Sequence, residues 1–122
     1  MYNIDFYETI DGHSDIREFL DSLRLKAKTV KDTRIQLGQV VRYIELLEKN
    51  GTNLPITVAK HLEDEIWELR PGGNRVFFFY FDHGTYVLLH HFQKKSQKTP
   101  RREILKAKSE MRDYISRKEP EQ

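Results

Sequence analysis

Two arginines flank a short, glycine-rich turn, and their spacing suggests a site for an anion. Arg70 ends one run of strand-forming residues, Arg75 begins the next, and the residues between them are Pro-Gly-Gly-Asn, which favour a turn. In a β-hairpin the two guanidinium groups would lie close together and would need an anion between them. A guanidinium matches phosphate oxygens and stays charged at any relevant pH. The pattern therefore indicates a phosphate clamp; ion pairs to Glu63, Glu65 or Glu68 are the alternative.

A second cationic segment follows the last strand-forming run and leads into a predicted helix. Residues 93–118 contain 10 lysines and arginines against 3 acidic residues, whereas residues 1–92 contain 11 against 14. Cations at the start of a helix oppose its dipole, so an external anion would stabilise this region. Such asymmetry indicates a polyanionic partner, and a solvated charged loop is the alternative. The candidate contacts to RNA or the ribosome are Lys98, Arg101, Arg102 and Lys106.

Two adjacent histidines, His90 and His91, end the last predicted strand. Neighbouring strand residues point to opposite faces of a sheet, so these two rings would not bind one metal ion together. One ring is expected to pack against the helices and the other to lie on an open face. An imidazole on that face could transfer protons near neutral pH. We therefore expect metal-free chemistry without a cofactor.

Length and composition favour one domain that depends on packing for its stability. The chain has 122 residues and no cysteine, which excludes disulfides, thiolate metal sites and cysteine nucleophiles. We expect a single domain over residues 1–118 and a disordered tail over 119–122. The amino terminus lacks the pattern of a signal peptide, and no segment approaches the roughly 20 apolar residues that would span a bilayer. A cytoplasmic protein is therefore expected.

The spacing of apolar residues predicts an α+β fold. Ser14 or Asp15 can cap the first helix, Asn50-Gly51 can end the second, and Thr99-Pro100 can start the last, with Thr99 as its cap. The predicted order is a strand at 2–8, a helical hairpin over about 14–27 and 31–49, strands at 65–70, 75–82 and 86–92, and a carboxy-terminal helix. We expect an antiparallel sheet with the hairpin packed on one face, and the other face free for function.

Two segments resemble the phage-derived Gp49-like/HigB toxins of the RelE/ParE superfamily. They are Trp67–Phe77 and Leu88–Pro100, which contain Glu-Leu-Arg, Asn-Arg before an aromatic strand, and Phe-Gln-Lys-Lys-Ser-Gln-Lys-Thr-Pro. The resemblance implies the toxin of a type II toxin–antitoxin system, a metal-independent endoribonuclease that cleaves translated mRNA on the ribosome and inhibits translation. It also implies a helix-turn-helix, HigA-like antitoxin, with which the toxin would form a heterotetramer through antitoxin dimerisation.

The resemblance also suggests roles for individual residues. Arg75 falls where relatives place the arginine that contacts the scissile phosphate, Lys94 or Lys95 falls where they place a basic residue, and Arg70 matches a frequent family arginine. The two lysines of the RelE strand would lie at Ile66 and Glu68, and the RelE terminal tyrosine has no match, with Arg101 or Arg102 nearest. Arg75 and Arg70 are therefore expected to stabilise the phosphorane, Lys94 or Lys95 the leaving group, and His90 or His91 to transfer protons.

Two other functions fit the same sequence. A ParE-like protein would inhibit DNA gyrase with the same fold, and its arginines would be binding residues. A non-catalytic RNA- or ribosome-binding protein would use the basic loop only for phosphate contacts. Cleavage of RNA by the intact protein distinguishes these alternatives from a ribonuclease.

Overall fold

The strands and helices follow the predicted order, with one strand added. The structure is a computed structural model and describes residues 1–119, so the expected tail lies, apart from Glu119, outside the described residues. No helix within this range is long and apolar enough to cross a membrane. The elements are β1 (Asn3–Phe6), α1 (Asp15–Ala27), α2 (Lys31–Asn50), β2 (Ala59–Glu63), β3 (Ile66–Leu69), β4 (Asn74–Phe81), β5 (Thr85–Gln93) and α3 (Arg101–Lys118).

The helical hairpin begins and ends where its sequence predicts. The hydroxyl of Ser14 accepts a hydrogen bond from the backbone N–H of Arg17 at 3.1 Å, which caps α1. Gly51 ends α2 with a φ of 61°, a left-handed conformation that glycine adopts at little cost. The predicted antiparallel hairpin of α1 and α2 is therefore confirmed.

The five strands form one mixed sheet in the order β1-β5-β4-β3-β2. The β3, β4 and β5 strands form the predicted antiparallel meander, whereas β1 pairs with β5 in parallel. The β2 strand was not predicted, because its sequence, Ala-Lys-His-Leu-Glu, lacks the alternation of a half-buried strand. It pairs antiparallel with β3 and forms one edge of the sheet.

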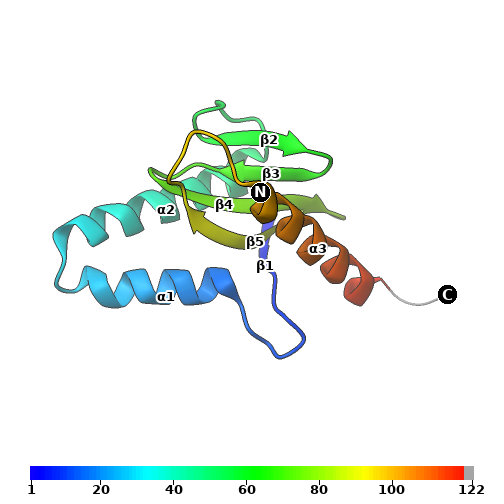
Figure 1. Cartoon of the computed structure of the whole chain (residues 1–122), viewed down its shortest axis with the longest axis horizontal. Coiled ribbons are helices and arrows are strands. Elements are labelled where there is room, and N and C mark those ends of the chain that lie inside the picture. The colour runs from blue at the N-terminus through cyan, green and yellow to red at the C-terminus, as the bar shows by residue number, and fades with distance from the viewer. Residues whose placement is uncertain (120–122) are drawn as a thin grey trace.

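Helices cover both faces of this sheet, so the expectation of a free face was wrong. On one face the hairpin packs on Val76, Phe78 and Leu88; on the other, α3 packs on Phe77 and Phe79. The α3 helix contributes three buried residues to the second core: Ala107, Met111 and Tyr114. Because β4 is apolar on both faces, leaving either exposed would cost its burial energy. Figure 1 shows α3 crossing the sheet apart from the hairpin.

A β-bulge in β5 changes which residues share a face. Val76 pairs with His91 and Phe78 with Leu88, so β5 has one extra residue between these pairs. As a result Leu89 packs in the core under α3, and His90 also contacts that side, 4.9 Å from the ring of Phe77. The bulge therefore turns two consecutive residues toward α3.

Candidate phosphate-binding site

Two arginines meet at a buried glutamate where β3 ends and β4 begins. The Oε2 atom of Glu68 lies 3.5 Å from Nε of Arg70 and 3.8 Å from Nε of Arg75. The Oε1 atom of the same carboxylate accepts a hydrogen bond of 3.2 Å from the hydroxyl of Thr99. The predicted proximity of the two arginines is confirmed, and the ion pair considered as its alternative is also present.

The single carboxylate does not satisfy both arginines. Arg75 donates from Nη1 to the carbonyl oxygens of Gly72 and Asn74, both at 2.8 Å. The Nε atoms of Arg70 and Arg75 are buried, yet neither has a hydrogen-bond acceptor among residues 1–119. Burial lowers the pKa of the Arg75 guanidinium, the charge of Glu68 opposes this change, and Arg70 adds to it. A second anion would therefore stabilise the cluster.

Lys94 adds a third cation beside the two arginines. Its backbone N–H donates to the carbonyl oxygen of Gly73 at 2.8 Å, which ties the start of the basic loop to the turn between β3 and β4. Burial, followed by the nearby charge of Arg75, lowers the pKa of the Lys94 ammonium below its usual range. An ammonium with a lowered pKa gives up its proton more readily. Lys94 can thus contribute both positive charge and a proton.

Glu68, Arg70 and Lys94 line an open pocket of about 310 Å³ between β2, β3 and the basic loop, whereas Arg75, next to Glu68, is not one of its lining residues. Glu68 is the only acidic residue in its lining, and four cations surround it: Lys60, Arg70, Lys94 and Lys98. Thr99 also lines the pocket; it was predicted to cap α3, but Pro100 occupies that position and the Thr99 hydroxyl bonds Glu68 instead. The excess of positive charge suits a phosphate group of an extended ligand.

His61, on the unpredicted strand β2, lines the same pocket. Its Nε2 atom lies 2.7 Å from the carbonyl oxygen of Asp64, which can only accept a hydrogen bond, so Nε2 carries a proton. In the neutral ring Nδ1 is then an acceptor. Sequence reasoning missed this residue because it missed the strand. His61 follows Lys60 and lies far from the basic loop in the sequence, so no local pattern indicates that it belongs to a site.

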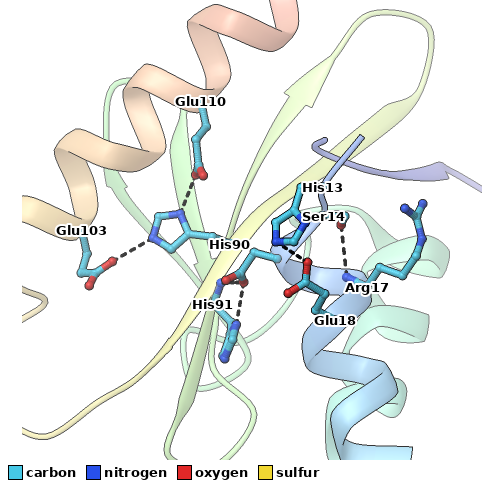
Figure 2. A network of polar contacts seen from close by, with 9 residues as sticks. His13, Ser14, Arg17, Glu18, His90, His91, Glu103 and Glu110 are labelled. Atoms are coloured by element: carbon cyan, nitrogen blue, oxygen red, sulfur yellow. Dashed lines mark hydrogen bonds and ion pairs between the residues drawn. The ribbon is translucent and has the colours of Figure 1, made fainter. Parts of the chain in front are cut away.

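The adjacent histidines lie on opposite sides of β5, as predicted, but neither lies on an open face (Figure 2). His90 is buried under α3, with Nε2 2.9 Å from Glu103 and Nδ1 2.5 Å from Glu110. The Nδ1 atom of His91 lies 2.6 Å from Asp15, and its ring stacks on Phe19 of α1. The open-face placement was wrong because α3 covers the second face. The structure brings neither ring into the pocket.

The remaining predicted residues divide between the pocket and the surface of α3. Lys95 and Arg102 line a separate pocket beside Phe92, and Arg102 is well exposed. Arg101 forms an ion pair with Glu63. Lys106 is exposed and has no ion-pair partner within the described residues. Of the proposed RNA contacts, Lys98 alone joins Lys94 in the cationic pocket.

The carboxylate of Glu68 should hold the two arginines of this site together. We expect Glu68→Gln to lower the free energy of unfolding by about 2 kcal/mol, less than the roughly 3–5 kcal/mol typical of fully buried pairs, because Arg70 is partly solvated. Inorganic phosphate should raise the urea midpoint of this variant more than that of the wild type, since it replaces the lost anion. Equal effects of phosphate on both proteins would contradict an anion site. Glu63→Gln, at a half-buried carboxylate paired with Arg101 and Lys108, is the matched control and should lack this response.

A mixed sheet with a helical hairpin and a carboxy-terminal helix is consistent with a RelE-like α+β fold. Residues 18–112 match the model of the family described as phage derived protein Gp49-like (DUF891). The chain therefore belongs to this phage-derived, toxin-like family. No curated protein matches the chain.

Proposed function

We propose that this protein is the toxin of a type II toxin–antitoxin system and that it cleaves translated mRNA as a metal-independent endoribonuclease. The observation that carries the proposal is the cluster of Arg70, Arg75 and Lys94 around the single carboxylate of Glu68. Three cations against one anion form a site for a phosphodiester. Membership of a toxin-like family supports the same conclusion.

The reaction that fits this site is attack by a ribose 2′-OH on its own 3′-phosphate. The 2′ oxygen loses its proton and bonds to phosphorus, and the bond from phosphorus to the 5′ oxygen breaks. The leaving oxygen gains a proton, so the products are a 2′,3′-cyclic phosphate and a free 5′-OH. The step needs a proton acceptor, a proton donor and stabilisation of the charged phosphorane. No metal enters this balance.

The residues around the pocket can be assigned to these three roles. Arg75 and Arg70 stabilise the phosphorane through their positive charge, which the single carboxylate of Glu68 only partly balances. Lys94 protonates the leaving 5′ oxygen, helped by its lowered pKa. His61 accepts the 2′-OH proton at Nδ1; His90 and His91 do not, since carboxylates hold both rings outside the pocket.

The ribosome would order the mRNA substrate, and the antitoxin would inhibit the toxin. A ribosome would hold the mRNA in an extended, reactive geometry, which is worth roughly 7–11 kcal/mol at the extreme. A helix-turn-helix, HigA-like antitoxin would inhibit by covering Arg75 and the loop from Lys94 to Arg102. Both interactions would take place in the cytoplasm.

Cleavage by ribosomes programmed with a defined mRNA tests this function. We expect the wild-type protein to cut within translated codons and to leave 5′-OH ends, which polynucleotide kinase can label directly. Products with 5′-phosphate ends would indicate hydrolysis by another route and contradict the proposed chemistry. Intact mRNA at protein concentrations that stop growth would contradict the ribonuclease, and a DNA supercoiling assay would then test gyrase inhibition.

A further inference from the structure

A long groove follows the seam between α1 and α2, away from the cationic pocket. It consists of two adjoining cavities of about 300 and 530 Å³ that are shallow and open to solvent and share Arg24 and Val41 in their linings. The first cavity reaches the edge strand β1, and the second reaches the tip of the hairpin. Neither shares a lining residue with the cationic pocket. In Figure 1 the hairpin tip projects away from the sheet and from α3.

Gly38 lies in this groove, and the fold of the chain itself does not explain it. It occupies the interior of the 20-residue helix α2, where glycine destabilises a helix relative to alanine. A Cβ atom added at this position would meet no heavy atom within 4 Å among the described residues, and the backbone does not require a positive φ. The missing side chain keeps the groove open for the close approach of something outside the chain.

The charge around the groove differs between its two ends. Residues 24–34, at the hairpin tip, include five lysines and arginines and one aspartate, although residues 1–92 as a whole are acidic. Lys28 and Arg34 line this end of the groove, Glu45 and Glu48 line the end near β1, and Arg24 lines both. An occupant with acidic residues at one end and basic residues at the other would therefore bind in one direction.

The exposed apolar residues of the hairpin tip favour a protein partner. Leu25 is 68% exposed, Val30 43% and Ile35 62%, and all three lie among the cations of the tip, although none of them lines the groove itself. A surface for RNA would pair cations with polar or aromatic groups, since aliphatic side chains gain little from a phosphate backbone. Aliphatic side chains beside lysine and arginine complement a helix with one apolar face and acidic flanks.

We propose that the α1–α2 groove is the docking site for an amphipathic helix of another protein. The partner helix places small and aliphatic residues over Gly38 and Val41 and acidic residues against Arg24, Lys28 and Arg34. The site is separate from the cationic pocket, so its occupant leaves Arg70 and Arg75 uncovered. This inference does not depend on the proposed ribonuclease activity.

Fluorescence anisotropy with two labelled synthetic peptides tests the proposal. One peptide has leucine and alanine on one helical face, glutamates at its first end and lysines at its second; the other has the same composition in scrambled order. We expect the wild-type protein to bind the patterned peptide about tenfold more tightly or better. Lys28→Glu should remove this preference, because it reverses the charge at the basic end. Lys49→Glu, an exposed charge reversal outside the groove linings, should retain it.

Gly38→Gln separates loss of the groove from loss of the fold. Its side chain should fill the groove and remove peptide binding while it raises the urea midpoint, because glutamine favours helix more than glycine does. Equal binding of the two peptides to the wild type would overturn the proposal. Displacement of the patterned peptide by single-stranded RNA would also overturn it, because this result assigns the groove to RNA. A dimer in sedimentation that Gly38→Gln abolishes would overturn it as well, because this result assigns the groove to a second copy of the chain.

Discussion

Arg75→Ala should lower the rate of mRNA cleavage on programmed ribosomes by about 10²–10³-fold, the usual cost of one lost electrostatic donor at a reacting phosphate or carbonyl. The residue is only 8% exposed, and its Nε lies 3.8 Å from Glu68, a residue of the pocket lining, without a hydrogen-bond acceptor among residues 1–119. A phosphorane carries more negative charge than the starting diester, so this donor contributes most in the transition state. Single-turnover rates with saturating ribosomes measure the loss directly.

The controls for Arg75 must separate chemistry from folding and from binding. Arg75→Lys retains the charge but loses the forked donor and the bonds to Gly72 and Asn74, so its activity should lie between those of alanine and the wild type. Arg112→Ala removes an exposed arginine of α3 and should leave the rate unchanged. If Arg75→Ala weakens ribosome binding by the same factor as it slows cleavage, Arg75 is a binding residue, and the catalytic assignment is wrong.

Local signals predicted the helical hairpin and the meander well. The Ser14 cap, the Gly51 stop and the aromatic run of β4 depend on neighbouring residues or on simple periodicity, and the structure retains all three. The same is true of Arg70 and Arg75, because a short turn alone brings the two strand ends together. Features that depend on contacts within about ten residues of sequence could therefore be predicted.

Features that depend on contacts between residues distant in the sequence could not be predicted from it. The β2 strand exists because it pairs with β3, although its own sequence lacks alternation. The position of α3 depends on the second apolar face of β4, which needs a cover of its own. The bulge in β5, which turns His90 toward α3, follows from pairing with β4 and has no signature in the sequence.

The centre of the candidate site shows the same limit. Glu68 follows Ile66 on one face of a strand whose neighbours are apolar, and a carboxylate there signals a buried partner. The prediction from the sequence included Glu68 only as one of three possible partners of a surface ion pair. The contact from Thr99 to Glu68 joins residues 31 positions apart, so it required the three-dimensional structure.

His61→Ala should reduce cleavage by about 10²–10⁴-fold while leaving the affinity for ribosomes and RNA nearly unchanged. His61 and Lys94 line the same pocket. The Nε2–H of His61 is held by the carbonyl oxygen of Asp64, which leaves Nδ1 of the neutral ring free to accept a proton. The ring is exposed, so its loss should cost little stability. The decisive measurement is the pH dependence of the single-turnover rate.

A general base gives a rate that rises with pH until the base is deprotonated, so this acid limb should be present in the wild type and absent from the residual activity of His61→Ala. Added imidazole should partly restore the variant, because a free imidazole can enter the open pocket and accept the proton. His13→Gln, an exposed histidine paired with Glu18, is the matched control and should keep both the rate and the acid limb.

An acid limb that persists in His61→Ala would show that another group accepts the 2′-OH proton. With no other histidine in the pocket lining, the carboxylate of Glu68 would then be the next candidate, and Glu68→Gln would remove the limb instead.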